Sequence, residues 1–174
     1  DRKKYAETVL AGMSENLVAI MVASWLFAGA IGEMVKQSGA VQALVELLIQ
    51  GDVGSSVFLV GTFFIAALVG TSTGTAVGTV LLVTPILFPA GLSIGCDPYW
   101  ILGAILAGGA FGDDFSPLSD TTIASAQTQG VDIATSVRAR LKYAAIAGLF
   151  AVVVFAFAGG NETIIMTPSP QEAT

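Results

Sequence analysis

The sequence predicts an all-α integral membrane protein, and three observations support this fold class. Of the 174 residues, 54% are hydrophobic and only 11% are charged, whereas an ordinary soluble domain carries about 25% charged residues. The mean hydropathy is +0.79. Apolar runs of helix length follow one another along most of the chain. A chain with so few charges could not cover a soluble surface, so we expect its helices to lie in a bilayer.

Two apolar runs are predicted to cross the bilayer once each. Residues 17–35 form the first run and residues 141–159 the last, and each approaches the ~20 residues that span a bilayer core. Glu33 lies near the end of the first run, where it is either an interfacial residue or a functional acid. Residues 41–50 are too short to cross, but their apolar side chains follow helical spacing, which indicates an interfacial helix.

The apolar run at residues 57–91 is almost uncharged, and the sequence TSTGT at residues 71–75 interrupts it. Each arm has roughly 14–16 residues, which gives a helix of about 21–24 Å, shorter than the ~30 Å hydrocarbon core. Two interpretations are open at this point. The segment is either a broken spanning helix or a re-entrant hairpin with residues 71–75 at its tip.

Two clusters of basic residues favour the hairpin. They are residues 2–4 and the group Arg138, Arg140 and Lys142. The positive-inside rule assigns both clusters to the cytoplasm, so an even number of crossings must separate them. A re-entrant hairpin that enters from the outside meets this condition. We therefore expect a protein integral to the cytoplasmic membrane, with its basic ends in the cytoplasm and its polar C-terminal tail, residues 161–174, outside.

A second interrupted segment covers residues 99–127 and contains GGAFGDDFSPLSDTT at residues 108–122. Pro117 has no main-chain N–H and disfavours a helix, so we expect this helix to unwind between Gly112 and Pro117, with the glycines assisting. Asp113 lies about 20 Å along the helix from Trp100, near the middle of the bilayer. An unpaired charge is costly at that depth, so its carboxylate must hold a proton or a cation.

Side chains that suit a sodium ion surround this predicted break. Hard cations prefer carboxylate, carbonyl and hydroxyl oxygens. The carboxylates are Asp113 and Asp120, and the hydroxyls are Ser116, Ser119, Thr121 and Thr122. Less specific interpretations stay open, because Asp120 could be a helix N-cap and the pair Asp113 and Asp114 could lie in a surface loop. Adjacent residues point in different directions, so only one of this pair can face the site.

The composition excludes several other kinds of protein. Histidine is absent and Cys96 is the only cysteine, which excludes a zinc centre, a Ser-His-Asp triad and an intrachain disulfide. The net charge of −6 and the lack of a large basic patch argue against binding to nucleic acid. We therefore expect neither an enzyme nor a bound cofactor.

The two interrupted segments resemble a known family. GDDFSPLSDTT at residues 112–122 resembles the G-D-x-x-S-P-x-S-D-T-T segment of the NhaC-type sodium/proton antiporter family, and GTSTGTAVGT at residues 70–79 is similar to its T-G-T-S-x-G-T segment. The resemblance implies secondary active transport with exchange of Na+ for H+. It implies cation and proton binding by Asp113, Ser116, Ser119, Asp120, Thr121 and Thr122, and by Thr71, Ser72, Thr73 and Thr75 at the hairpin tip. The motif fixes the position of Asp113, so we expect Asp113 rather than Asp114 to face the site.

The resemblance also implies an architecture and a partner. The broader ion-transporter group has two inverted repeats, each with a re-entrant hairpin and a discontinuous helix, and residues 1–160 resemble the C-terminal repeat. We expect a missing N-terminal repeat of the same transporter as partner within the bilayer, and a homodimer stays open. The hairpin lacks the tryptophan that often follows the serine in the antiporters. A cation-coupled transporter of a small organic acid or amino acid is therefore an alternative, and a truncated, non-transporting fragment is another.

Overall fold

The computed structural model describes residues 2–14, 16–50 and 54–159, and the predicted tail lies outside them. Across these residues the chain forms eight α-helices and no strand. The helices are α1 (Arg2–Met13), α2 (Asn16–Gln37), α3 (Ala40–Gln50), α4 (Ser55–Thr73), α5 (Ala76–Ser93), α6 (Pro98–Phe115), α7 (Asp120–Thr128) and α8 (Ile133–Ala158). Among the described helices, α4, α5 and α8 are long and apolar enough to cross a membrane. The predicted fold class, an all-α membrane protein, is confirmed.

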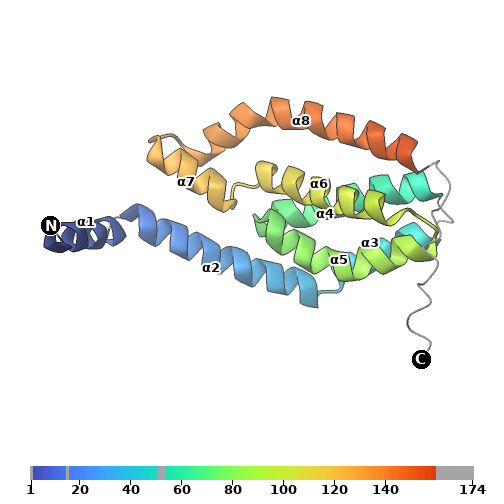
Figure 1. Cartoon of the computed structure of the whole chain (residues 1–174), viewed down its shortest axis with the longest axis horizontal. Coiled ribbons are helices and arrows are strands. Elements are labelled where there is room, and N and C mark those ends of the chain that lie inside the picture. Colours follow the sequence, from blue (N-terminus) through green and yellow to red (C-terminus); the bar gives the residue numbers. More distant parts are fainter. Residues whose placement is uncertain (1, 15, 51–53, 160–174) are drawn as a thin grey trace.

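The long helices lie side by side, with α2 and α8 on opposite sides of α4, α5 and α6 (Figure 1). α1 and the connection between α7 and α8 lie at one end of the molecule, so the two basic clusters lie toward that end. The start of α4 and the end of α8 meet at the other end, where a Cβ on Gly159 would lie 2.6 Å from Ser56 Oγ. The chain therefore enters α4 from the end opposite to its basic residues.

The predicted hairpin consists of α4 and α5, which only Gly74 and Thr75 connect. Gly74 adopts φ +67°, the left-handed conformation that glycine favours, and ends α4. Its N–H donates to the Gly70 carbonyl at 2.8 Å. Thr75 then caps α5, because its hydroxyl accepts a hydrogen bond from the Gly78 N–H at 3.3 Å. Local turn chemistry thus fixes the position of the hairpin tip.

Both arms of the hairpin are longer than the sequence indicates. Residues 71–73 continue α4 and do not interrupt it, and α5 continues through Pro85 and Pro89. With 19 and 18 residues, the arms measure about 27–28 Å, close to the ~30 Å bilayer core. Length therefore does not distinguish a re-entrant hairpin from two full crossings, and the re-entrant arrangement stays a prediction.

Small residues allow α4 and α6 to cross closely. Gly108 and Gly112 are four residues apart on α6, so both lie on one helix face. A Cβ on Gly108 would lie 2.8 Å from the Ala66 Cβ, and a Cβ on Gly112 would lie 2.8 Å from the Thr71 nitrogen. Such spacing of small residues lets helix backbones approach one another in membrane proteins. Both glycines are helical, so they serve the packing of α6 and do not unwind it.

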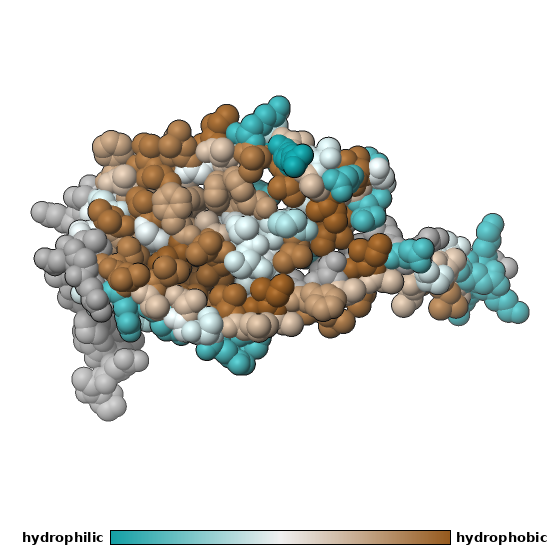
Figure 2. Space-filling view, turned by 180° about the vertical axis from the view of Figure 1, so that it is seen from behind, coloured by the Kyte–Doolittle hydropathy of each residue, from teal (hydrophilic) through white to brown (hydrophobic). Residues whose placement is uncertain are grey.

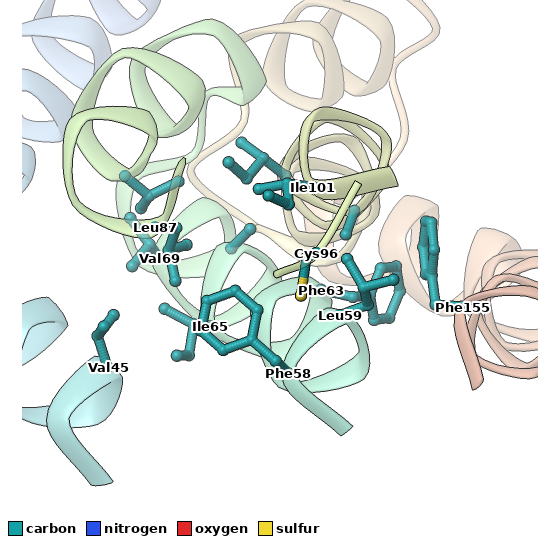
Figure 3. Packing of buried hydrophobic residues seen from close by; sticks show 14 of the residues in the cluster. Val45, Phe58, Leu59, Phe63, Ile65, Val69, Leu87, Cys96, Ile101 and Phe155 are labelled. Carbon is teal, nitrogen blue, oxygen red and sulfur yellow. The ribbon is translucent and has the colours of Figure 1, made fainter. Parts of the chain in front are cut away.

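The hydrophobic core packs the hairpin against α6 and packs its first arm, α4, against α8 as well. Phe58, Leu59 and Phe63 of α4 are each at most 1% exposed. Figure 3 shows them among core residues of the neighbouring helices, which include Leu87 of α5, Ile101 of α6 and Phe155 of α8. The ring of Phe63 lies 6.1 Å from that of Phe155, which ties α4 to α8. The hairpin tip is thereby positioned against the end of α6.

The short helix α3 packs on the hairpin. Val41 and Val45, one turn apart on its apolar face, are 1% and 4% exposed and belong to the core. The apolar face of α3 therefore contacts protein and is not left free for lipid. Its position at a membrane interface, expected for residues 41–50, stays a prediction.

The outer surface is largely apolar. Figure 2 shows hydrophobic residues across most of one face, with hydrophilic residues gathered along its edges and toward the arm that α1 forms. Large exposed side chains include Leu81 at 72%, Phe150 at 71% and Phe157 at 80%. An apolar surface of this extent suits contact with lipid or with another apolar protein surface.

Candidate functional site at the hairpin tip and the helix break

The break between α6 and α7 consists of residues 116–119. Ser116 leaves helical geometry with a ψ of 127°, because a residue that precedes proline disfavours the α-helical region. Its hydroxyl accepts a hydrogen bond from the Leu118 N–H at 3.1 Å. Ser119 caps α7 by accepting a hydrogen bond from the Thr122 N–H at 3.5 Å. The unwound stretch is thus shorter, and begins later, than the stretch that the sequence predicts.

The hairpin tip contacts this break. The single hydroxyl proton of Thr71 is shared between the carbonyl oxygen of Gly112, at 3.2 Å, and that of Ala67, one turn earlier on α4, at 2.9 Å. Gly74 lies against the main chain of the break, since a Cβ on it would lie 2.7 Å from the carbonyl carbon and oxygen of Leu118. The two motifs that the sequence identifies are therefore adjacent in space.

Asp113 lies where the tip and the break meet. Its carboxylate interacts with the Ser119 hydroxyl and with the main-chain N–H of Ala76, the first residue of α5. One carboxylate oxygen, Oδ1, is buried and has no hydrogen-bond partner within the described part of the chain. Asp114 and Asp120 are its acidic neighbours. An oxygen without a partner in this position is available to a proton or a cation.

The hydroxyl residues predicted for the site divide into buried and more exposed ones. Ser116, Ser119 and Thr122 are 0% exposed, and Thr73 is 2% exposed. The Thr73 hydroxyl lies 3.1 Å from that of Thr79 within the hairpin. By contrast, Thr121 is exposed and pairs with Ser119 at 3.0 Å, and Ser72 donates to a carbonyl of its own helix at 2.8 Å. Neither of these two hydrogen bonds reaches the opposite motif.

Asp120 is the first residue of α7, and it is not the N-cap. Its Oδ1 accepts a hydrogen bond from the adjacent Thr121 N–H at 2.6 Å. Ser119 takes the N-cap position instead. The capping interpretation of Asp120 is therefore wrong by one residue, and an acid in the first turn of a helix still interacts favourably with the helix dipole.

The acid next to Asp113 has a different partner. Asp114 forms an ion pair with Arg140 of α8, with 3.6 Å between Oδ1 and Nη1. Arg140 Nη2 also donates a hydrogen bond to Thr122 Oγ1. The sequence predicts Arg140 only as part of a cytoplasmic basic cluster, so this contact is missed. The signal for this contact is Asp114 itself, because a carboxylate within a membrane segment requires a cationic partner.

A cavity lies beside the hairpin tip, lined by residues of α2, α3 and α5. Its volume is about 520 Å³, and Thr73 and Thr75 of the tip line it. Glu33 of α2 and Gln42 of α3 face the same cavity. Glu33 Oε1 accepts a hydrogen bond from Gln37 Nε2 at 2.8 Å. The lining of the cavity is mostly apolar, and Glu33, Gln42 and the tip hydroxyls are its polar side chains.

Four helix ends converge around Asp113. α4 and α6 end here, and α5 and α7 begin here. Carbonyl groups at helix C-termini attract cations, and N–H groups at helix N-termini attract anions. Within the described residues, no three Cys, Asp or Glu side chains gather closely enough to hold a metal ion. A sodium ion at Asp113 would therefore need main-chain and hydroxyl oxygens as further ligands.

The sequence is similar to known transporters. A sequence model of the Na+/H+ antiporter family matches residues 1–160. The chain is 32% identical over 164 residues to the malate-2H(+)/Na(+)-lactate antiporter of Bacillus subtilis (strain 168). It is 27% identical over 155 residues to the Na(+)/H(+) antiporter NhaC of Alkalihalophilus pseudofirmus, and 29% identical over 145 residues to the Na(+)/H(+) antiporter NhaC of Bacillus subtilis.

These similarities cover most of the chain and a smaller part of each relative. The aligned regions include 91%, 89% and 83% of the chain, but only 34%, 31% and 30% of the three relatives in the same order. The chain thus spans about a third of the length of the curated relatives it matches. No solved structure matches the chain.

Proposed function

Because the chain belongs to the Na+/H+ antiporter family, we propose that it forms part of a secondary transporter that exchanges Na+ for H+ across the cytoplasmic membrane. The observation that carries this proposal is Oδ1 of Asp113, a buried oxygen that has no hydrogen-bond partner among the described residues, at the contact between hairpin tip and helix break. Buried polar atoms in proteins normally have a hydrogen-bond partner. A bound proton or cation meets that need.

Competition at Asp113 is the basis of the exchange. A protonated carboxyl group donates a hydrogen bond, whereas the ionised carboxylate attracts a cation, so one group holds a proton or a cation in turn. The buried hydroxyls of Ser116 and Ser119 supply neutral oxygen ligands beside it. Asp120 adds a second carboxylate nearby. Loss of the proton on one side of the membrane allows Na+ to bind, and return of the proton on the other side releases it.

The proposed orientation has the basic clusters in the cytoplasm and the open end of the hairpin outside. The positive-inside rule is its basis. The position of α1 and of the α7–α8 connection at one end of the molecule, opposite the start of α4, supports it (Figure 1). A second, inverted repeat is the proposed partner, which would cover exposed apolar surface and bring the site to the middle of the bilayer.

This proposal is tested by measuring antiport in proteoliposomes. The vesicles contain the transporter, and a trapped fluorescent pH probe reports proton movement. A Na+ gradient should drive proton movement with the wild-type protein. Asp113→Asn keeps the size of the side chain but removes its charge, and we expect exchange to fall to the level of empty vesicles. Glu46→Gln removes an exposed acid from α3 and should retain wild-type exchange. Undiminished exchange by Asp113→Asn contradicts the assignment of the site.

A second candidate function is exchange of a small organic acid coupled to a cation. The cavity beside the tip, about 520 Å³, lies within the range of about 300–1,000 Å³ that small-molecule sites occupy. The N-termini of α5 and α7 would suit a carboxylate group. One relative is named as a malate-2H(+)/Na(+)-lactate antiporter. Uptake of radiolabelled malate or lactate that depends on a Na+ gradient would favour this candidate, and its absence would favour Na+/H+ exchange alone.

A further inference from the structure

Arg140 connects the two halves of the broken helix. Its guanidinium group pairs with Asp114 in the last turn of α6 at 3.6 Å and donates to Thr122 in the first turn of α7. Asp114 and Thr122 flank the unwound residues 116–119, so one cation on α8 spans the break. Arginine suits this role, because its donors form a rigid planar group that can bond in several directions at once.

We propose that Arg140 is a positioning residue that competes with the transported cation for the oxygens of the break. This inference rests on the proposed function, the binding of Na+ at Asp113. Thr122 Oγ1 accepts a hydrogen bond from Arg140, so one of the lone pairs that the sequence assigns to the cation is already in use. The carboxylate of Asp114 is neutralised by the same guanidinium group. A cation at Asp113 that takes Thr122 as a ligand must share its hydroxyl oxygen with Arg140 or displace the guanidinium group.

The surroundings of the guanidinium group allow such displacement. The side chains of Arg140 and Asp114 are 35% and 58% exposed, so water screens their attraction. Arg140 Nε is buried and has no hydrogen-bond partner among the described residues, which is a cost of the present arrangement. The contact therefore holds α6 and α7 together, yet it is weak enough to exchange when a cation arrives.

Two substitutions distinguish competition from simple structural support. Sodium binding to the purified transporter is followed as the rise in thermal unfolding temperature with NaCl, with choline chloride as the reference salt. Arg140→Gln removes the competing charge, and we expect the apparent Kd for Na+ to fall about tenfold, the effect of one nearby, partly screened charge. Asp114→Asn removes the acidic partner of the guanidinium group and leaves its positive charge uncompensated, so we expect the Kd to rise. Loss of a purely structural contact would instead raise the Kd in both variants.

Arg138→Gln is the matched control. Arg138 is exposed and lies two residues earlier on α8, and its substitution removes the same charge. The Arg138→Gln protein should therefore bind Na+ with the Kd of the wild type. Should Arg140→Gln fail to fold, Arg140→Met, which keeps the apolar stem of the side chain, takes its place with the same expected shift.

The outcomes separate this inference from the proposed function. The inference alone is overturned if the wild-type protein responds to Na+ but Arg140→Gln leaves the Kd unchanged. It is also overturned if Arg140→Gln and Arg138→Gln shift the Kd equally. A wild-type protein without any response to Na+ overturns the proposed function and the inference together. Opposite shifts for Arg140→Gln and Asp114→Asn support the inference.

Discussion

Replacing Gly112 by alanine should weaken the crossing of α4 and α6 on which the site depends. The new Cβ would overlap the carbonyl oxygen of Ala67 and lie 2.8 Å from the Thr71 nitrogen. Both neighbours are main-chain atoms, so the two helices must separate by about 1 Å to restore normal contact distances. The same movement stretches the hydrogen bond from Thr71 Oγ1 to the Gly112 carbonyl, which is 3.2 Å long.

The expected loss of stability combines three contributions. Overpacking of a close contact costs about 1–3 kcal/mol. Loss of the hydrogen bond adds about 0.5–1.5 kcal/mol. Alanine is favoured over glycine inside a helix by about 1 kcal/mol, which offsets part of the loss. The net decrease in the free energy of unfolding is therefore about 2 kcal/mol.

Gly103→Ala is the matched control for this prediction. Gly103 lies on the same helix, and its Cβ would meet the ring of Phe155 at 3.8 Å, an ordinary contact. Helix propensity alone predicts a neutral effect or a gain of up to about 1 kcal/mol there. Chemical unfolding in detergent micelles, followed by circular dichroism, measures the free energy of unfolding of both variants. Equal values for Gly103→Ala and Gly112→Ala would refute the close crossing.

Three further predictions concern the tip, the break and the cysteine. Gly74→Ala should lower the free energy of unfolding by more than about 1 kcal/mol, because its φ of +67° disfavours a side chain and its Cβ would lie 2.7 Å from the Leu118 carbonyl. An unchanged free energy would contradict the tight turn. Ser119→Ala removes the cap of α7 and should cost about 1 kcal/mol in the same assay, whereas Ser119→Thr should retain most of it. Cys96 is 4% exposed and burial raises the pKa of its thiol, so thiol reagents at pH 8 should label it far more slowly in the folded than in the unfolded protein. Equal labelling rates would show that this thiol is accessible.

The sequence predicts the elements of this fold best where a local signal acts. Pro117 ends α6 at the preceding serine, and TSTGT contains the glycine that ends α4. The lengths of the hairpin arms depend on more distant contacts and are underestimated. Thr71, for example, stays helical with its hydroxyl bonded to carbonyl oxygens of its own helix and of α6. A pattern of hydroxyl residues alone does not show which carbonyl oxygen on α6 such a hydroxyl will contact.

The sequence predicts which residues belong to the candidate site, but not which of them contact one another. Carboxylates and hydroxyls are conspicuous in an apolar chain, so the candidate residues were visible in the sequence. Which of Asp113 and Asp114 faces the hairpin depends on the rotation of α6, because one residue along a helix turns the side chain by about 100°. Contacts at Gly108 and Gly112 fix that rotation. The ion pair of Asp114 with Arg140 follows from it and needs the position of α8 as well.

Under the proposed function, the convergence of four helix ends bears on which substrate such a site selects. Two starts and two ends contribute partial charges of opposite sign in equal number, so the backbone as a whole favours neither cations nor anions. Selectivity is left to a small set of side chains, with Asp113 and Arg140 carrying opposite charges within it. A few substitutions could therefore redirect the same scaffold from a metal cation to an organic anion without altering the path of the main chain.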